Sequence, residues 1–190
     1  MNIIIFGPPG AGKGTQSSFI VKKYNLLQIS TGKILREEIK NSSAIGQKIS
    51  SLMSSGSLVA DEIVNKLIED IVSNKEYQNK FIFDGYPRNL DQANYLENVL
   101  TKHDQKIDIV LKLSVSLETI KKRISERQTL EKRTDDNEDI AIKRYQTYEK
   151  STEPVIEYYK KLNLLKVVDG ERPIDQINKE ISDIIDTIEG

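Results

Sequence analysis

Residues 2–15 have the sequence NIIIFGPPGAGKGT. The run at 2–6 is built mainly of isoleucine and phenylalanine and is typical of a strand covered on both faces. A glycine- and proline-containing loop follows at 7–12, and a helical pattern begins at Lys13. Four of the ten glycines lie in this stretch, at positions 7, 10, 12 and 14. The stretch therefore predicts a buried strand that leads through a glycine-rich loop into a helix.

A loop of this kind favours the binding of phosphate. Glycines allow backbone N–H groups to approach phosphate oxygens closely, and the N-terminus of the helix adds positive potential. Lys13 is placed to reach the β- and γ-phosphates of a nucleotide. Serine or threonine usually follows this lysine directly, whereas here Gly14 stands between Lys13 and Thr15. Thr15 is therefore a weaker candidate than usual for a ligand of the nucleotide's Mg²⁺.

A second apolar strand pattern, KFIFD at 80–84, ends in an acid. In enzymes with this kind of phosphate loop, an acid at the end of a neighbouring strand holds Mg²⁺, directly or through water. We expect Asp84 to hold the ion through water.

Strand and helix patterns alternate along the rest of the chain. Further strands are predicted at 27–29, 107–113 and 164–168, and helices at 13–24, 31–40, 44–54, 61–73, 89–101, 116–127, 138–162 and 174–188. This alternation implies right-handed crossovers and a parallel sheet, and five strands are too few for an eight-stranded barrel. We therefore expect an α/β fold, a three-layer α/β/α sandwich with a five-stranded parallel sheet. The helices within 30–73 indicate an inserted subdomain, and 128–137 is predicted as a polar exposed loop.

Composition excludes several classes of protein. The chain has 28 basic and 29 acidic side chains and a net charge of −1, so we expect no nucleic acid as a partner. With no cysteine and one histidine, His103, it has neither disulfides nor thiolate or multi-histidine metal sites. The opening apolar run is too short for a signal peptide or a membrane span, so we expect no membrane association and a cytoplasmic location.

A phosphate loop is common to kinases, GTPase switches and motors. The N-K-x-D and D-x-x-G motifs of a GTPase are absent from the sequence. The choice of cation is informative, because lysine is the usual cationic side chain in this chain and arginine is rare. There are only seven arginines: Arg36, Arg88, Arg123, Arg127, Arg133, Arg144 and Arg172. The planar fork of arginine grips phosphate in two places, so this set favours a phosphate-transferring enzyme.

At this point the sequence resembles adenylate kinase, in its short-lid form, over nearly its whole length. The motifs that carry the resemblance are GPPGAGKGT at 7–15, STGKILR at 30–36, GSLVADEIV at 56–64, FDGYPRNLDQA at 83–93, KRISER at 122–127, RTDD at 133–136, IKR at 142–144 and VDG at 168–170. The resemblance implies a phosphate-loop nucleoside monophosphate kinase, which converts MgATP and AMP reversibly into two ADP. It also implies a cis bond between Tyr86 and Pro87.

The resemblance assigns roles to particular residues. It implies an ATP site at Gly10, Ala11, Gly12, Lys13, Gly14, Thr15, Arg127 and Gly170. It implies an AMP site at Thr31, Arg36, Ser57, Leu58, Val59, Gly85, Tyr86, Arg88, Gln92, Arg133 and Arg144. The residues expected to stabilise the transferred phosphoryl group are Lys13, Arg88, Arg123, Arg133 and Arg144.

The resemblance also implies a division of the chain. The core would comprise 1–29, 60–126 and 138–190, the AMP-binding helical insert 30–59, and a short lid 127–137. Five residues separate Arg127 from Arg133, too few for the long lid that sometimes holds zinc, so we expect Mg²⁺ and no structural zinc. Lys33 and Ala60 depart from the usual acid and proline, at positions not expected to touch phosphate.

The acceptor has an alternative. A short-lid UMP/CMP kinase is the close relative, but that group typically has alanine at the position of Thr31 and asparagine at that of Gln92. A glutamine amide can donate to and accept from the edge of adenine. We therefore expect AMP as the acceptor, with ATP, ADP and AMP as partners, bound by a monomer.

Overall fold

Five parallel strands form the centre of the molecule. The computed structural model describes residues 1–131 and 137–189. The strands lie in the order β2-β3-β1-β4-β5, and each neighbouring pair is parallel. Their bounds are Ile3–Phe6 (β1), Leu27–Ser30 (β2), Phe81–Asp84 (β3), Ile109–Ser114 (β4) and Leu165–Asp169 (β5). The predicted five-stranded parallel sheet is confirmed.

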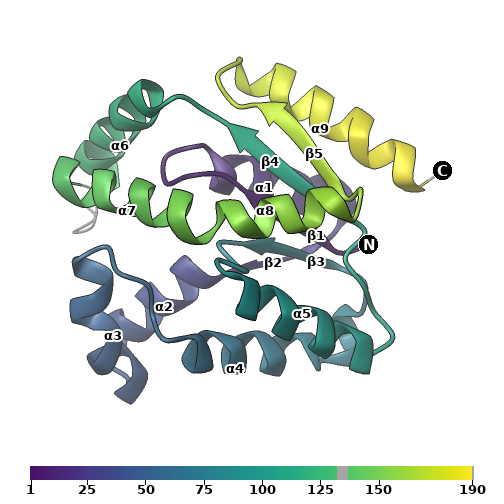
Figure 1. The fold of residues 1–190 in the computed structure, drawn as a ribbon, viewed down its shortest axis with the longest axis horizontal. Coiled ribbons are helices and arrows are strands. Elements are labelled where there is room, and N and C mark those ends of the chain that lie inside the picture. The colour runs from purple at the N-terminus through teal and green to yellow at the C-terminus, as the bar shows by residue number, and fades with distance from the viewer. Residues whose placement is uncertain (132–136, 190) are drawn as a thin grey trace.

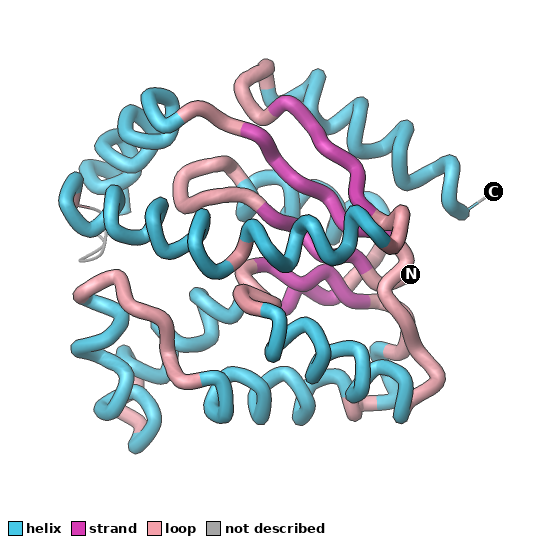
Figure 2. Tube along the Cα trace, in the orientation of Figure 1, coloured by secondary structure: helices cyan, strands magenta, loops and turns pink. Residues whose placement is uncertain are grey.

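Helices cover both faces of this sheet and complete the three layers (Figure 1). Their bounds are Lys13–Tyr24 (α1), Thr31–Lys40 (α2), Ala44–Ser54 (α3), Asp61–Val72 (α4), Leu90–Lys102 (α5), Leu117–Glu131 (α6), Glu138–Ser151 (α7), Glu153–Lys161 (α8) and Ile174–Glu189 (α9), with a 3-10 turn at Lys75–Tyr77. Figure 2 shows the strands enclosed by helices. Within the described ranges, no helix is both long and apolar enough to cross a membrane.

The central strand β1 explains the unbroken apolar run that opens the chain. Ile4 and Phe6 pack in one core with residues of α4, α5 and α8, whereas Ile3 and Ile5 pack in a second core with α1 and α9. All four side chains are buried. Because both faces of β1 are covered, neither set of alternate positions can be polar.

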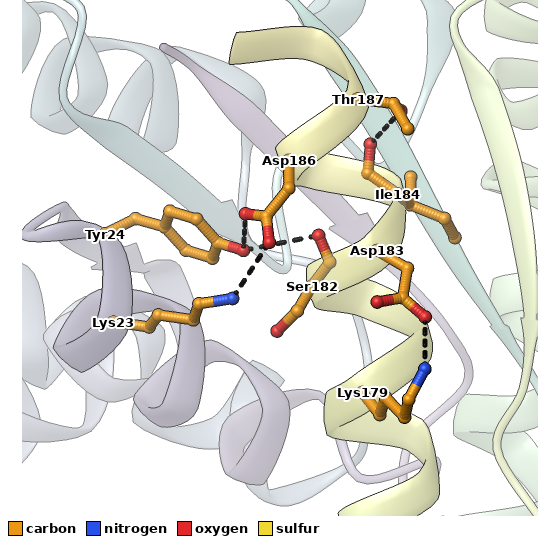
Figure 3. A network of polar contacts seen from close by, with 8 residues as sticks. All are labelled: Lys23, Tyr24, Lys179, Ser182, Asp183, Ile184, Asp186 and Thr187. Atoms are coloured by element: carbon orange, nitrogen blue, oxygen red, sulfur yellow. Dashed lines mark hydrogen bonds and ion pairs between the residues drawn. The ribbon is translucent and has the colours of Figure 1, made fainter. Parts of the chain in front are cut away.

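The helix α1 is held at its C-terminal end by α9 (Figure 3). The hydroxyl of Tyr24 donates to Asp186 Oδ1 at 2.6 Å, and Lys23 Nζ lies 3.2 Å from Asp186 Oδ2. These two contacts lower the pKa of Asp186. The helix that follows the glycine-rich loop is thus tied to the outer layer of the fold at its far end.

Two predicted helical ranges are wrong. The single helix expected at 138–162 is two helices, α7 and α8, separated at Thr152. Pro154 lies in the first turn of α8 and lacks the N–H that would continue the ladder of α7. In contrast, α6 continues to Glu131 and takes up the first four residues of the expected loop 128–137. Leu130 is 83% exposed there, so that turn rests on the helix propensity of its residues and needs no apolar face.

The helices α2 and α3 form a pair at one end of the molecule, apart from α9 (Figure 1). They cross closely at Gly46, where a Cβ would lie 2.1 Å from the carbonyl oxygen of Glu38. Ser43 caps α3 by accepting a hydrogen bond from the Gly46 N–H at 2.9 Å. The sequence between β2 and α4 therefore forms a helical unit that follows directly from the sheet at β2 and leads into α4.

Candidate active site

The glycine-rich loop, residues 7–12, connects the carboxyl end of β1 to α1. Gly10 and Gly12 have φ angles of 86° and 93°, which side-chain-bearing residues rarely adopt. Gly12 precedes the first residue of α1 and has no side chain with which to cap it. The first N–H groups of α1 therefore point out of the helix toward this loop, as an anion-binding terminus requires.

Lys13 lies at the point where several charges meet. Its Nζ donates to the carbonyl oxygens of Gly7 and Pro8 at 2.7 and 3.2 Å. Burial lowers its pKa to about 8; Asp84 opposes this shift, while Arg88, Arg144 and Arg127 add to it. Arginines from three separate parts of the chain are therefore close enough to Lys13 to act on its charge.

Asp84 is the last residue of β3, and in the sheet it lies beside Ile5 and Ser30. It is 9% exposed, and its Oδ2 accepts a hydrogen bond from Gln28 Nε2 at 3.3 Å. Thr15, in contrast, is exposed on the first turn of α1. A carboxylate and a hydroxyl are oxygen donors of the kind that Mg²⁺ takes when substrate phosphates and water supply its other ligands. Among the described residues, no group of three or more His, Cys, Asp or Glu could hold a metal.

A cavity lies beside the loop, between β1, the α2–α3 pair, the segment after β3, and α7. It brings together ten residues that the sequence analysis assigns to a site: Lys13, Thr31, Arg36, Ser57, Leu58, Val59, Gly85, Arg88, Gln92 and Arg144. These residues lie in the segments that follow β1, β2 and β3 and on α7, and they are far apart in the sequence. Arg133 lies outside the described residues.

The segment after β3 is organised around the carbonyl of Gly85. Thr31 Oγ1 donates to this oxygen at 2.9 Å, and Arg88 Nε donates to it at 2.7 Å. A Cβ on Gly85, whose φ is 80°, would lie 3.0 Å from both side chains. The peptide bond between Tyr86 and Pro87 is cis, as expected from the resemblance. Gly85 is thus required both for the backbone angle and for the close approach of its neighbours.

Gln92 is held at both ends of its amide. Its Oε1 accepts a hydrogen bond from the Arg88 N–H at 2.7 Å, and its Nε2 donates to Asp61 at 2.7 Å. The carbonyl of Arg88 in turn accepts from Thr152 Oγ1 at 3.1 Å. Tyr86 lies in the core: it is 1% exposed, and its hydroxyl donates to Asn65 at 2.6 Å. Burial raises the pKa of Tyr86.

The helix α6 contacts the loop from the other side. Arg123 donates from Nη2 to the Gly170 carbonyl at 2.9 Å and from Nη1 to the Ala11 carbonyl at 3.4 Å. Gly10 packs against α6 so closely that a Cβ would lie 3.0 Å from Ile124 Cγ1. Arg123 therefore links Ala11 to Gly170, and Gly10 packs against the helix that carries Arg123. Gly14, like Thr15, is exposed.

Sequence reasoning missed part of the cavity wall. Thr147, Tyr148 and Thr152 line it beside Arg144. Thr147 and Tyr148 follow Arg144 by three and four positions, so they lie on the same face of α7. Their spacing from Arg144 in the sequence could therefore have predicted that Thr147 and Tyr148 line the same cavity.

The family model for adenylate kinase matches residues 5–164. This chain belongs to the adenylate kinase family. It is 44% identical to the adenylate kinase of Pelagibacter ubique, over 97% of this chain and 99% of that protein. It is 38% identical to that of Bartonella henselae, over 97% of this chain and 100% of that protein. It is also 38% identical to that of Flavobacterium psychrophilum, over 99% and 100% of the two chains.

These adenylate kinases differ in length from one another. The alignment with the P. ubique adenylate kinase runs over 211 positions, more than the 190 residues of this chain, whereas that with the F. psychrophilum adenylate kinase runs over 189. The chain thus lacks residues that the first relative has and is similar in length to the other. All three relatives are named adenylate kinase, so the alternative of a UMP/CMP kinase has no support among them.

Proposed function

We propose that this member of the adenylate kinase family transfers the γ-phosphoryl group of MgATP to AMP and yields two ADP. The observation that carries this proposal is the single cavity in which Lys13, Arg36, Arg88 and Arg144 meet Gln92. Cations able to bind phosphate and an amide able to bind a base therefore line the same cavity.

In the proposed reaction, a phosphate oxygen of AMP attacks the γ-phosphorus of ATP. A bond forms between these two atoms, the bond from the γ-phosphorus to the β–γ bridging oxygen breaks, and negative charge appears on the β-phosphate of ADP. The attacking oxygen is already anionic at neutral pH, so no general base is needed. Catalysis then consists of positioning and of stabilising charge.

The residues around the loop divide this task. Lys13 and the N–H groups at the start of α1 would bind the phosphates of ATP, and Arg88 and Arg144 would bind the transferred group. Arg36 would hold the phosphate of AMP, with Thr31 and Val59 at its nucleoside. Asp84 would hold the Mg²⁺ of MgATP through water, and the ion would neutralise charge on the phosphate oxygens.

Water is the competing acceptor and has to be kept from the γ-phosphate. We infer that the insert 30–59 and the short lid 127–137, with Arg127 and Arg133, close over both nucleotides before transfer. We propose that the working unit is a monomer. Size-exclusion chromatography with light scattering, combined with an assay of the monomer fraction, tests this last point.

A panel of acceptors tests the proposed function. AMP, UMP, CMP and GMP are offered one at a time with MgATP, and formation of ADP is measured. We expect kcat/KM for AMP to exceed that for each of the others by about 10²-fold or more, since a buried polar site rejects a base that leaves its groups unpaired. Equal use of UMP or CMP would contradict AMP as the acceptor.

A further inference from the structure

A carboxylate that the proposed mechanism does not use lies behind Gln92. Asp61, the first residue of α4, accepts a hydrogen bond from Gln92 Nε2 at 2.7 Å. Asn89 Nδ2 donates to both carboxylate oxygens of Asp61, at 3.1 and 2.9 Å. Among the described residues, Gln92 lines the cavity and Asp61 does not. Asp61 therefore contacts the residue expected to meet the base, from the side away from the cavity.

The position of Asp61 is itself fixed by this arrangement. Asn89 caps α5, because its Oδ1 accepts from the Gln92 N–H at 2.8 Å. The same side chain donates to Asp61, so Asn89, Asp61 and Gln92 form a closed ring of hydrogen bonds. Gln92 is 2% exposed, which leaves little opportunity for water to replace these contacts.

Asp61 and the backbone N–H of Arg88 together fix which end of the Gln92 amide is oxygen and which is nitrogen. A carboxylate only accepts and a backbone N–H only donates. If the amide turned by 180°, its oxygen would face the Asp61 carboxylate and its NH₂ group would face the N–H of Arg88. Both contacts would be repulsive, so only the observed orientation satisfies the two neighbours.

We propose that Asp61 is a specificity-determining positioning residue, which holds the Gln92 amide in the orientation that accepts a 6-aminopurine and rejects a 6-oxopurine. The proposal rests on the proposed function, in which Gln92 contacts the base. An amide has two N–H donors and two acceptor lone pairs. Arg88 and Asp61 use one of each, which leaves one donor and one acceptor for the ligand.

The two purines present opposite patterns to such an amide. Adenine has an amino donor beside a ring-nitrogen acceptor, whereas hypoxanthine has a carbonyl acceptor beside a ring N–H donor. An amide fixed in one orientation matches one order of donor and acceptor, whereas an amide able to turn can match both. Asp61 would thus add discrimination by excluding the amide orientation that a 6-oxopurine needs.

The experiment compares AMP with inosine monophosphate as acceptors at saturating MgATP, with kcat and KM measured for each. The variant Asp61→Asn has the same shape, but its own amide can face either end of Gln92. We expect the ratio of kcat/KM for AMP to that for inosine monophosphate to fall by about tenfold, or about 1.4 kcal/mol. The fall should come from a higher KM for AMP and a lower KM for inosine monophosphate, with kcat for AMP nearly unchanged.

Glu62→Gln is the matched control. It removes the same charge from the same turn of α4 at an exposed position, so the ratio should equal that of the unmodified protein. Asn89→Ser is the second variant, because serine still caps α5 but no longer donates to Asp61. It should lower the ratio in the same direction by a smaller factor, and it keeps the proposal testable if Asp61→Asn does not fold.

The proposal is overturned if either folded variant keeps the ratio of the unmodified protein. It is also overturned if Asp61→Asn lowers kcat equally for both acceptors, since that result would indicate a purely structural role. Failure of the unmodified protein and of Glu62→Gln to phosphorylate AMP would instead contradict the proposed function on which the inference rests.

Discussion

Lys13 carries its charge where its surroundings oppose it. Burial, together with three arginines, lowers its pKa to about 8, and Asp84 compensates only in part. Asp84 thus offsets the charge of Lys13 only in part, and the phosphates of a nucleotide would supply further negative charge. The arrangement that makes the charged lysine costly in the ligand-free protein therefore favours a polyanionic ligand.

We predict that the affinity of the ligand-free protein for MgATP falls as the pH rises through and above about 8. Bound phosphate favours charged Lys13, so above this pKa the protein must take up a proton in order to bind. This requirement costs up to about tenfold in affinity per pH unit. Calorimetric titration at a series of pH values measures how the affinity for MgATP changes with pH, and Lys13→Met should not show this fall in affinity. A constant affinity of the unmodified protein across this range would be evidence against the assigned role of Lys13.

The guanidinium group of Arg88 is a fixed cation in the cavity. Its Nε donates to Gly85, which orients the guanidinium group in the cavity. We expect Arg88→Ala to lower kcat by about 10³-fold, because charge developing on the transferred group loses a fixed cation. The kcat of Arg88→Lys should lie between that of the unmodified protein and that of Arg88→Ala, since lysine keeps the charge but not the planar fork. Steady-state rates at saturating MgATP and AMP measure this, and a loss below about tenfold for Arg88→Ala would contradict it.

The residues of the site were predictable to different degrees. The glycines of the loop, Lys13 and Asp84 follow from local pattern, because a strand, a loop and a helix N-terminus determine their positions. Gln92 and Arg88 were expected in the site, but the hydrogen bonds that hold Gln92 between Arg88 and Asp61 depend on packing between α4 and α5. No spacing in the sequence reports such a contact.

At the scale of elements, apolar periodicity located every strand and most helix ends. It failed where an element does not depend on an apolar face. The last turn of α6 has an exposed Leu130 and carries no periodic signal, yet it is helical. Apolar periodicity failed again at Thr152, because it continues from α7 into α8 without interruption. Pro154 in the first turn of α8 is the residue that separates the two helices.

The close crossing of α2 and α3 gives an element-scale prediction. A Cβ at position 46 would overlap the backbone of Glu38, so Gly46→Ala should push the two helices apart, at a cost of about 1–3 kcal/mol. Because this pair carries Arg36 and leads to Ser57, Leu58 and Val59, we expect KM for AMP to rise severalfold with KM for MgATP little changed. Ser50→Ala, an exposed substitution on α3, is the control. An unchanged KM for AMP in Gly46→Ala would show that this crossing does not shape the AMP site.

At the scale of the whole molecule, a net charge of −1 conceals a concentrated positive site. Lys13, Arg36, Arg88 and Arg144 line one cavity, and none of the described residues that line it is an acid. The net charge carries no information on whether a few cations are gathered in one place. The fold gathers them, because the loops at the carboxyl ends of parallel strands meet at one edge of the sheet.

Contacts across the cavity give a prediction for turnover. Lys143 Nζ donates to Ser57 Oγ at 3.3 Å, and a Cβ on Gly56 would lie 3.0 Å from Arg144 Cγ, so the insert touches α7. We propose that the products leave when this side opens, so we expect opening to limit kcat. Rapid-quench measurement should then show a burst of ADP in the first turnover. Linear formation of ADP from the start would contradict a rate-limiting opening.

The central claim is direct transfer of one phosphoryl group between two adenine nucleotides. The most direct test is to incubate the protein with MgATP labelled in its γ-phosphate and unlabelled AMP, and to separate the products. Direct transfer predicts that the label appears in the β-phosphate of ADP, with one labelled and one unlabelled ADP for each ATP consumed, and that this stops in Lys13→Met. Label that appears as inorganic phosphate, or that stays in ATP while AMP is unchanged, would contradict direct transfer to AMP.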